Sequence, residues 1–423
     1  MKRMITYLCS ASAAVFGLSL TTLAFATGID DKHSEPWQGV WTVELQTPGG
    51  GLPFELRCSR KENNWTTTIH NADETIEVAN RIAGSSLVLS MPHYDSKLSL
   101  ELDGEDNDRA VGVWKKTRGA DAVAELACLA VRMNPKPSGI DAPNKQQLEP
   151  WLGRFAIQFA DSEDLAVGIL KASDASNTEV RGTILTTTGD YRYLAGKVTD
   201  SGKLRLSCFD GAHAFLITAT MSEGTINGDF WSGDWYHTTW RGSRAPDVKL
   251  ADGFAQAVVN EDIRLSDLEF IDLDGNPAPM AAAKLRGKVT IVELFGSWCP
   301  NCHDAAVFLG ELDRRYAAQG LKVVGLGFEL TGRQERDLVQ LKRYVKRFDI
   351  DYPVLLAGLA DKSKASQAFP VLDRVRSYPT LIIVDQAGKV RTVYSGFSGP
   401  ATGEEHTRLC QRLEGIVRGL LAE

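Results

Sequence analysis

The sequence lacks an excess of basic residues. Its 423 residues contain 47 Lys and Arg against 54 Asp and Glu, a formal net charge of −7. From Ile263 onward the balance is nearly even, with 22 basic and 20 acidic residues. Nucleic-acid-binding domains carry clustered positive charge, so nucleic acid is not an expected partner. The nearly neutral C-terminal part also predicts weak electrostatic steering of its partners.

Long apolar runs are also lacking after residue 26. Before it, Lys2 and Arg3 precede an apolar run from Ala11 to Phe25 that ends in the small residues around Ala26. This pattern predicts a cleaved secretory signal peptide over residues 1–26. An uncleaved membrane anchor is the alternative, because the run is near the short limit of about 17 residues for a membrane span. Export predicts a periplasmic location for the remaining chain.

Cysteine is scarce in the remaining chain, which contains Cys58, Cys128, Cys208, Cys299, Cys302 and Cys410. So few cysteines in a chain of this length do not make a disulfide-stabilised scaffold, although thiols outside the cytoplasm oxidise readily. One close pair among scattered single cysteines indicates a dedicated redox site. Cys58 and Cys128 both lie in strand-like segments, and the sequence leaves open whether they form a structural disulfide.

Tryptophan is almost absent from the C-terminal part, since eight of the nine lie at or before Trp240. The N-terminal part also repeats itself. Residues 35–41 (EPWQGVW) match residues 149–155 (EPWLGRF), and Gly112 to Trp114 match Gly228 to Phe230 at nearly the same offset. We therefore predict two related modules, at residues 35–133 and 149–245, with a proline-rich linker at 134–143.

Both modules have the pattern of antiparallel β-structure. Short alternating runs such as Trp41 to Leu45 are separated by clusters of Gly, Asp, Asn and Ser, which predicts barrels or sandwiches. The tryptophans are expected mainly in the barrel cores. A ligand-binding or partner-docking role for the aromatic residues is the alternative.

The segment 263–423 instead alternates strands and helices. An apolar strand from Val289 to Phe295 precedes a helix from Cys299 to about Ala318. Further strands are expected at 321–328, 352–356, 380–385 and 390–396, with helices at 333–348 and 404–421. This order predicts an α/β sheet layered by helices. The whole chain is thus multidomain, with an all-β N-terminal region and an α/β C-terminal domain.

The residues Trp298-Cys299-Pro300-Asn301-Cys302 join the apolar strand to this helix. Unpaired N–H groups at a helix N-terminus favour a thiolate, which makes Cys299 the expected nucleophile. Cys302 lies within the first turn and can attack a mixed disulfide formed at Cys299. Pro300 suits the first helical position.

Glu293 interrupts the apolar strand six residues before Cys299. A buried carboxylate is costly unless it titrates or is paired, so Glu293 could relay the proton of Cys302. A strand-end glutamate that reaches solvent is the alternative interpretation.

These motifs, followed by Tyr378-Pro379-Thr380 before a strand, resemble the thioredoxin superfamily and most closely the exported TlpA- and ResA-like thiol–disulfide oxidoreductases. The resemblance covers about residues 263–421. It implies that Cys299 attacks, that Cys302 resolves, that Pro379 is a cis-proline and that Glu293 occupies the buried-acid position. Some relatives have an acidic residue shortly after the second cysteine. Ala305 and Ala306 occupy that stretch here, which leaves Glu293 as the expected proton relay. We expect the substrate to contact the surrounding residues Trp298, Pro300, Asn301, Tyr378 and Thr380.

Other chemistries fit the cysteine pair less well. Cys299 to His303 also satisfies the C-x-x-C-H pattern of covalent haem, but no methionine follows Met280 to serve as the usual distal ligand. Zinc would need two more soft ligands nearby, and the residues before Cys299 lack a peroxiredoxin pattern. We therefore expect no cofactor, metal or haem. His303 is predicted to be an exposed helix residue.

The sequence thus predicts an exported thiol–disulfide oxidoreductase, and the family resemblance implies that it is a protein-disulfide reductase. Its partners would be substrate protein disulfides and a membrane-linked thiol electron donor. The alternative is a partner-binding scaffold or redox sensor that uses its β modules, with a secondary role for the dithiol.

Overall fold

A computed structural model describes residues 36–62, 64–104, 106–133, 148–173, 179–283 and 285–423. The predicted signal peptide, residues 1–26, and the proline-rich linker at 134–143 lie outside the described residues. The described part from Pro36 to Glu423 forms one compact unit.

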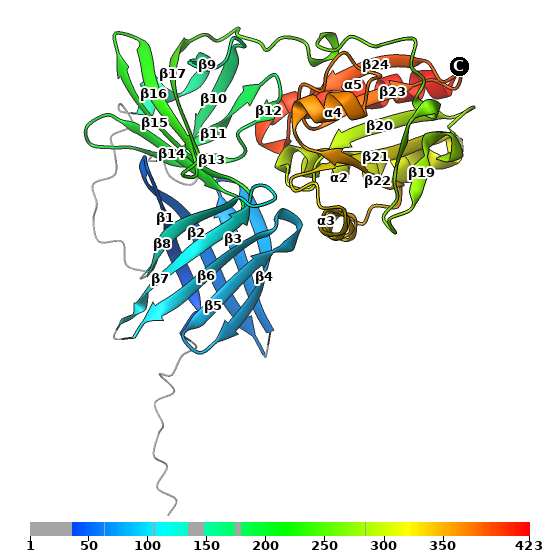
Figure 1. Cartoon of the computed structure of the whole chain (residues 1–423). Helices are drawn as coiled ribbons and strands as arrows, with labels where there is room; N and C mark the ends of the chain where they lie inside the picture. The colour runs from blue at the N-terminus through cyan, green and yellow to red at the C-terminus, as the bar shows by residue number, and fades with distance from the viewer. Residues whose placement is uncertain (1–35, 63, 105, 134–147, 174–178, 284) are drawn as a thin grey trace, which may run out of the picture. The chain divides into compact units, whose positions relative to one another are not determined.

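Alternation of buried and accessible residues makes the first repeat a closed antiparallel barrel (Figure 1). In β1 (Gly39–Thr47) the side chains of Trp41, Val43 and Leu45 are buried and their neighbours are half-buried or exposed, as expected for a strand with one buried face. The strands that follow are β2 (Gly50–Lys61), β3 (Asn64–Asn71), β4 (Glu74–Ala83), β5 (Ser86–Met91), β6 (Ser96–Asp103), β7 (Asp106–Thr117) and β8 (Val123–Arg132). β8 pairs with β1, with Arg132 opposite Trp41, and this pairing closes the ring. A short turn, η1 (Pro92–Tyr94), joins β5 to β6.

The second repeat closes in the same way, with one short strand added. Its strands are β9 (Gly153–Phe159), β10 (Ala166–Ala172), β11 (Glu179–Thr186), β12 (Gly189–Asp190), β13 (Leu194–Val198), β14 (Leu204–Phe209), β15 (Ala214–Ser222), β16 (Thr225–Ser232) and β17 (Tyr236–Arg244). The pairing of β10 with β11 closes the ring, and β12 pairs only with the end of β11. The structure thus confirms the prediction of two antiparallel β modules.

The tryptophans of the repeats lie mostly inside these barrels. Trp37, Trp41 and Trp114 are fully buried in the first core, and Trp151 and Trp240 are buried in the second. Large aromatic side chains supply much of the apolar area that a small barrel buries. The predicted role of these residues as barrel core is therefore confirmed for these five.

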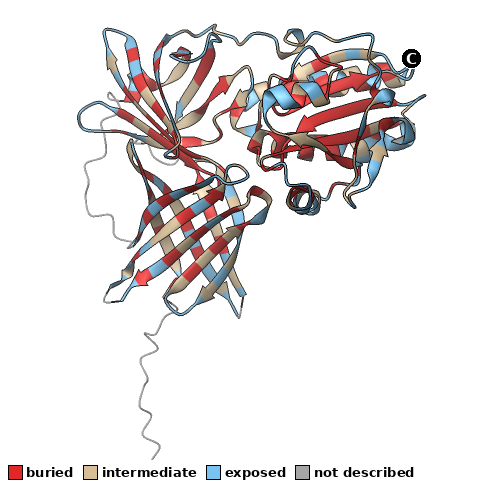
Figure 2. Ribbon diagram, viewed as in Figure 1, coloured by how far each residue is buried: buried red, intermediate tan, exposed pale blue. Residues whose placement is uncertain are grey.

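The C-terminal domain is a mixed sheet with strand order β19-β18-β22-β21-β20-β23-β24. Its strands are β18 (Glu269–Ile271), β19 (Pro277–Pro279), β20 (Val289–Phe295), β21 (Leu321–Glu329), β22 (Val354–Leu359), β23 (Thr380–Val384) and β24 (Val390–Ser395). Its helices are α2 (Pro300–Tyr316), α3 (Gln334–Phe348), α4 (Lys362–Ala368) and α5 (Glu404–Leu421). β20, β21 and β22 run parallel, and β20 is buried along its whole length (Figure 2). The predicted α/β architecture is confirmed, although α4 was not predicted.

Candidate redox site

The central strand β20 delivers the cysteine motif to the start of α2. After Phe295 the chain turns, and the backbone N–H of Cys299 donates to the carbonyl of Gly296 at 3.1 Å. Cys299 is the N-cap of α2 and Pro300 is its first residue. Proline is accommodated at this position because the first N–H groups of a helix have no intrahelical partner.

The two sulfur atoms are bonded to each other as a Cys299–Cys302 disulfide. The Sγ of Cys299 also accepts a hydrogen bond from the backbone N–H of Cys302 at 3.3 Å. Cys299 keeps 6% of its surface exposed and Cys302 keeps none. After reduction, the helix N-terminus would stabilise a thiolate at Cys299. Cys299 is therefore the more accessible sulfur of the pair, at the end of the helix that favours a thiolate.

The loop that precedes β23 also approaches Cys299. The Tyr378–Pro379 peptide bond is cis, and the carbonyl oxygen of Tyr378 lies 3.5 Å from the Sγ of Cys299. The ring of Trp298 packs edge-on against Tyr378 with centroids 5.6 Å apart, and its indole N–H donates to the carbonyl of Phe328 at 2.9 Å. The structure thus brings Trp298, Tyr378 and Pro379 together around Cys299.

The remaining residues predicted to contact the substrate are already engaged within the protein. Thr380 is buried, and its hydroxyl donates to the carbonyl of Ser377 at 2.8 Å. Pro300 is buried as well. The side-chain amide of Asn301 donates to Asp190 at 3.1 Å and to the carbonyl of Phe397 at 3.2 Å. In the disulfide form, fewer residues around Cys299 are therefore free to contact a substrate than the motif alone predicts.

Glu293 lies entirely inside the domain. Its two carboxyl oxygens have no hydrogen-bond partner among the described residues, and burial raises its pKa to about 8. The carboxylate acts electrostatically on Tyr344, whose hydroxyl donates to the carbonyl of Cys302 at 3.0 Å. An acid that titrates near neutral pH beside the resolving cysteine's turn is suited to proton transfer.

A second buried acid, Glu329, was missed in the sequence. It ends β21, and burial raises its pKa to about 8. Its carboxylate accepts hydrogen bonds from the backbone N–H of Ser297 at 2.9 Å and from the Ser297 hydroxyl at 2.8 Å. The expectation that Glu293 is the one acid beneath the site therefore needs correction. The signal was present, because Glu329 follows an apolar strand much as Glu293 interrupts one.

The prediction for His303 is wrong, because the side chain is buried rather than exposed. Its Nε2 lies 2.7 Å from the carbonyl oxygen of Ser297, and its ring stacks on that of Tyr94 with centroids 4.4 Å apart. Burial holds the pKa of His303 well below its usual range, so the ring is neutral. Tyr94 belongs to the first barrel, and no local sequence pattern indicates this contact.

The other cysteines within the described residues are free thiols: Cys58, Cys128, Cys208 and Cys410. Cys58 lies opposite Gly39 of β1, and Cys128 lies opposite Leu45 of the same strand. These positions are six residues apart, or about 20 Å along a strand. A disulfide requires Cα atoms within about 7 Å, so the open question of a Cys58–Cys128 disulfide is answered against it.

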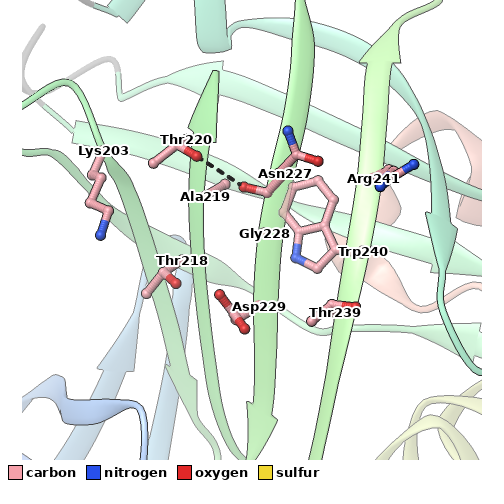
Figure 3. Close-up of a pocket in the computed structure, with 10 residues that line it drawn as sticks. All are labelled: Lys203, Thr218, Ala219, Thr220, Asn227, Gly228, Asp229, Thr239, Trp240 and Arg241. Carbon is pink, nitrogen blue, oxygen red and sulfur yellow. Dashed lines mark hydrogen bonds between the residues drawn. The ribbon is translucent and has the colours of Figure 1, made fainter. Parts of the chain in front are cut away.

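A polar hollow lies on the outer wall of the second barrel (Figure 3). Outward-facing side chains of β15, β16 and β17, among them Asn227, Asp229 and Arg241, line it. At the floor of the hollow Trp240, which belongs to the barrel core, packs closely on Gly228, since a Cβ atom at that glycine would lie 2.3 Å from the indole ring. The hollow includes none of the residues around Cys299.

Among the described residues, no helix is long and apolar enough to cross a bilayer. Nor do they contain a group of three or more His, Cys, Asp or Glu placed to hold a metal ion.

Comparison with known proteins agrees with this geometry. The family model described as Redoxin matches residues 241–407. The chain is 25% identical over 138 residues to the thioredoxin-like protein YneN of Bacillus subtilis. The aligned segment covers 33% of this chain and 73% of YneN. It is also 25% identical over 119 residues to the thiol-disulfide oxidoreductase ResA of Bacillus thuringiensis. This aligned segment covers 28% of this chain and 60% of ResA. The chain thus spans less than two thirds of the length of that ResA.

Solved structures with matching segments include a putative thiol:disulfide interchange protein DsbE from Chlorobium tepidum. It is 16% identical with a TM-score of 0.27, and the match covers 36% of this chain and 99% of that chain. A secreted Mycobacterium tuberculosis disulfide oxidoreductase is 17% identical with a TM-score of 0.27, over the same shares of the two chains. The C-terminal part of this protein is a Redoxin domain, distantly homologous to thiol–disulfide oxidoreductases of the ResA type.

Proposed function

We propose that this protein is an exported reductase of disulfides in substrate proteins. The observation that carries the proposal is the position of Cys299. It caps α2, accepts a hydrogen bond from the N–H of Cys302 and faces the Tyr378 carbonyl. These contacts supply a stabilised thiolate, a resolving thiol within one helical turn and an adjacent backbone edge for the substrate. The reducing direction rests on the likeness to ResA.

The reaction begins with the reduced dithiol. The Cys299 thiolate attacks one sulfur of the substrate disulfide, forms a mixed disulfide and releases the first substrate thiolate, which takes up a proton. Cys302 then loses its proton to the ionised form of Glu293, and its thiolate attacks the Sγ of Cys299. The substrate leaves as a dithiol and the protein retains the Cys299–Cys302 disulfide. Two electrons have then passed to the substrate, and a membrane-linked thiol donor restores the dithiol.

A single-turnover experiment tests this activity. Reduced wild-type protein is mixed with an unstructured peptide that contains one internal disulfide, and the thiols are trapped with an alkylating reagent and counted by mass spectrometry. We expect one peptide disulfide to be reduced for each protein disulfide formed. Cys299→Ser should show no reaction, and Cys302→Ser should accumulate the mixed disulfide. Equal, near-zero reduction by wild type and Cys299→Ser would refute the enzymatic function.

The direction of the reaction is tested by the reduction potential of the Cys299–Cys302 pair. Equilibration with glutathione buffers, followed by alkylation, measures the potential directly. A potential near that of thioredoxin, about −270 mV, supports a reductase. A potential near that of the strong oxidant DsbA, about −120 mV, would show that the protein forms disulfides instead.

Export is supported by the basic start, the apolar run and the small residues before Thr27. Fractionation of the producing cells, with N-terminal sequencing of the mature protein, tests this part of the proposal. We expect a periplasmic protein that begins at Thr27. An intact N-terminus in the membrane fraction would indicate an anchor.

The polar hollow on the second barrel favours the alternative of a partner-binding scaffold (Figure 3). Its Arg241 is exposed and Asp229 is half-exposed, so both could contact a partner. If the scaffold role dominates, Arg241→Ala should abolish the cellular function and Cys299→Ser should leave it intact. The opposite result supports the reductase.

A further inference from the structure

A loop of the second barrel lies directly on the redox motif. The carboxylate of Asp190 accepts a hydrogen bond from the side-chain amide of Asn301 at 3.1 Å and another from the backbone N–H of Gly399 at 2.6 Å. Asp190 is only 4% exposed. One barrel residue therefore joins the segment between the two cysteines to the loop that follows β24.

The loop of the second barrel and the C-terminal domain approach each other most closely at two glycines. A Cβ atom at Gly189 would lie 2.9 Å from the Asn301 side chain, and one at Gly396 would lie 2.8 Å from the backbone of Thr188. Real Cβ atoms essentially never approach other atoms more closely than 3.0 Å. At Gly189 and Gly396 the contact between the barrel loop and the redox domain thus leaves no room for a side chain, as expected for a close contact rather than a loose one.

A buried arginine reinforces this contact. One Nη of Arg192 donates to Asp304 on α2, and the other donates to Glu74 of the first barrel at 3.2 Å. Its Nε lies 3.5 Å from a carboxylate oxygen of Asp210. A buried guanidinium is tolerated only where carboxylates pair with it. Arg192 therefore ties both barrels to the helix that begins at the redox motif.

The first barrel contributes a second contact through η1. Tyr94 stacks on His303 with an interplanar angle of 2°, and the side-chain amide of Gln340 on α3 donates to the carbonyl of Pro92 at 2.8 Å. We call residues 92–95 and 187–192 together the covering loops. They occupy the side of the motif formed by Asn301, His303 and Asp304.

The covering loops contact Asn301, in the segment between the two cysteines, and Cys299 beside this segment is only 6% exposed. We propose that they act as a size filter, with Asp190 and Arg192 as specificity-determining residues. This inference rests on the proposed function. For exchange, a substrate sulfur must come into bonding contact with the Sγ of Cys299. A disulfide within a folded protein carries bulk on all sides, which collides with the covering loops. An unhindered disulfide, in an unstructured polypeptide or a low-molecular-weight compound, reaches the sulfur.

The filter predicts which disulfides react. Oxidised glutathione plus the reduced protein gives two glutathione molecules and the Cys299–Cys302 disulfide, and an unstructured disulfide peptide reacts in the same way. A folded protein disulfide reacts slowly with wild type. Asp190→Ala removes both hydrogen bonds to the redox domain and should raise the rate with the folded protein several-fold, while the rate with glutathione stays unchanged. Comparison of the peptide with glutathione shows which source of unhindered disulfide the protein prefers.

An alkylation experiment tests the filter without any disulfide substrate. Reduced protein is treated with iodoacetamide or with a maleimide that carries a long polyethylene glycol chain, and modification is measured at the peptide containing Cys299. Asp190→Ala should raise the rate with the bulky reagent relative to the small one. Asp200→Ala is the matched control, since Asp200 is an exposed aspartate of the same barrel. Gln340→Ala provides a second opening variant at the η1 contact, should Asp190→Ala fold poorly.

The outcomes separate the two proposals. If wild type already shows the same bulky-to-small ratio as both opening variants, the size filter is refuted, whatever the protein reduces. If the ratio changes as expected but no disulfide is reduced by any variant, the covering loops are confirmed and the reductase function is refuted.

Discussion

The carboxylate of Glu329 holds Ser297 by both its backbone N–H and its hydroxyl, at 2.9 and 2.8 Å. Ser297 lies two residues before Cys299, and its carbonyl oxygen is 2.7 Å from the Nε2 of His303. The turn that presents the attacking cysteine is thus fixed from the strand beside it and from the helix that follows.

Glu329→Ala should loosen this turn. Leaving buried donors without an acceptor costs about 1–3 kcal/mol, so the free energy of unfolding should fall by about that amount, as measured by urea denaturation. Disulfide exchange should slow as well. Glu329→Gln keeps an acceptor for the N–H of Ser297 and should restore most of both losses. Equal effects of the two substitutions would contradict the positioning role of Glu329.

Glu293 should make the stability of the fold depend on pH. Its pKa is raised from 4.5 to about 8, so between these values the folded state binds a proton that the unfolded state has released. The free energy of unfolding therefore falls as pH rises from about 4.5 to 8, by on the order of 5 kcal/mol from this group. Glu293→Gln should remove this part of the slope, in denaturation curves recorded across the range. Parallel slopes for the two proteins would contradict the prediction.

The same substitution should slow the second chemical step. In the proposed mechanism the carboxylate of Glu293 accepts the proton of Cys302, and loss of general base catalysis costs roughly a hundredfold in rate. Quenched-flow measurement should show the mixed disulfide forming at the normal rate and decaying slowly. If the mixed disulfide decays as fast as in wild type, Glu293 is not the base.

Arg192→Ala should be strongly destabilising. It would leave the carboxylates of Glu74, Asp210 and Asp304 buried without their shared cation. Breaking a buried ion pair from one side costs about 3–5 kcal/mol. Arg181→Ala is the control, because its partners Asp73 and Glu179 both reach solvent, and surface pairs contribute about 0–1 kcal/mol. Thermal denaturation of both variants measures the difference.

Gly112 of the first repeat and Gly228 of the second occupy equivalent positions. A Cβ atom there would lie 2.0 Å from the carbonyl oxygen of Ser99 in the neighbouring strand. Gly112→Ala should therefore lower the free energy of unfolding by about 1–3 kcal/mol, the usual cost of overpacking. Gly119→Ala is the control, since the nearest atom to its Cβ would be 3.6 Å away, and should have little effect.

The parts of the fold that were predicted have strong local signals. The apolar strand β20, the proline at the start of α2 and the repeated glycines of the barrels are each set by neighbouring residues. α4 was missed because Lys362–Ala368 has little apolar content, and its start depends on Asp361 accepting a hydrogen bond from the N–H of Lys364.

The parts of the site that could not be predicted depend on contacts between distant segments. His303 is buried because Tyr94, more than 200 residues earlier, stacks on it. Asp190 and Arg192 look like ordinary loop residues in sequence, and they gain their role only when the second barrel reaches Asn301 and Asp304. No periodicity or spacing within a single segment reports such contacts.

The edge strand β19 has a consequence for encounters between copies of this chain. It consists of Pro277, Ala278 and Pro279, and neither proline can donate a backbone hydrogen bond. Exposed strand edges are templates for intermolecular pairing, and prolines at an edge prevent it. The barrels have closed their own sheets by ring formation. The β19 edge of the mixed sheet instead cannot pair readily with an incoming strand. This protects the chain against aggregation where partly folded chains are concentrated.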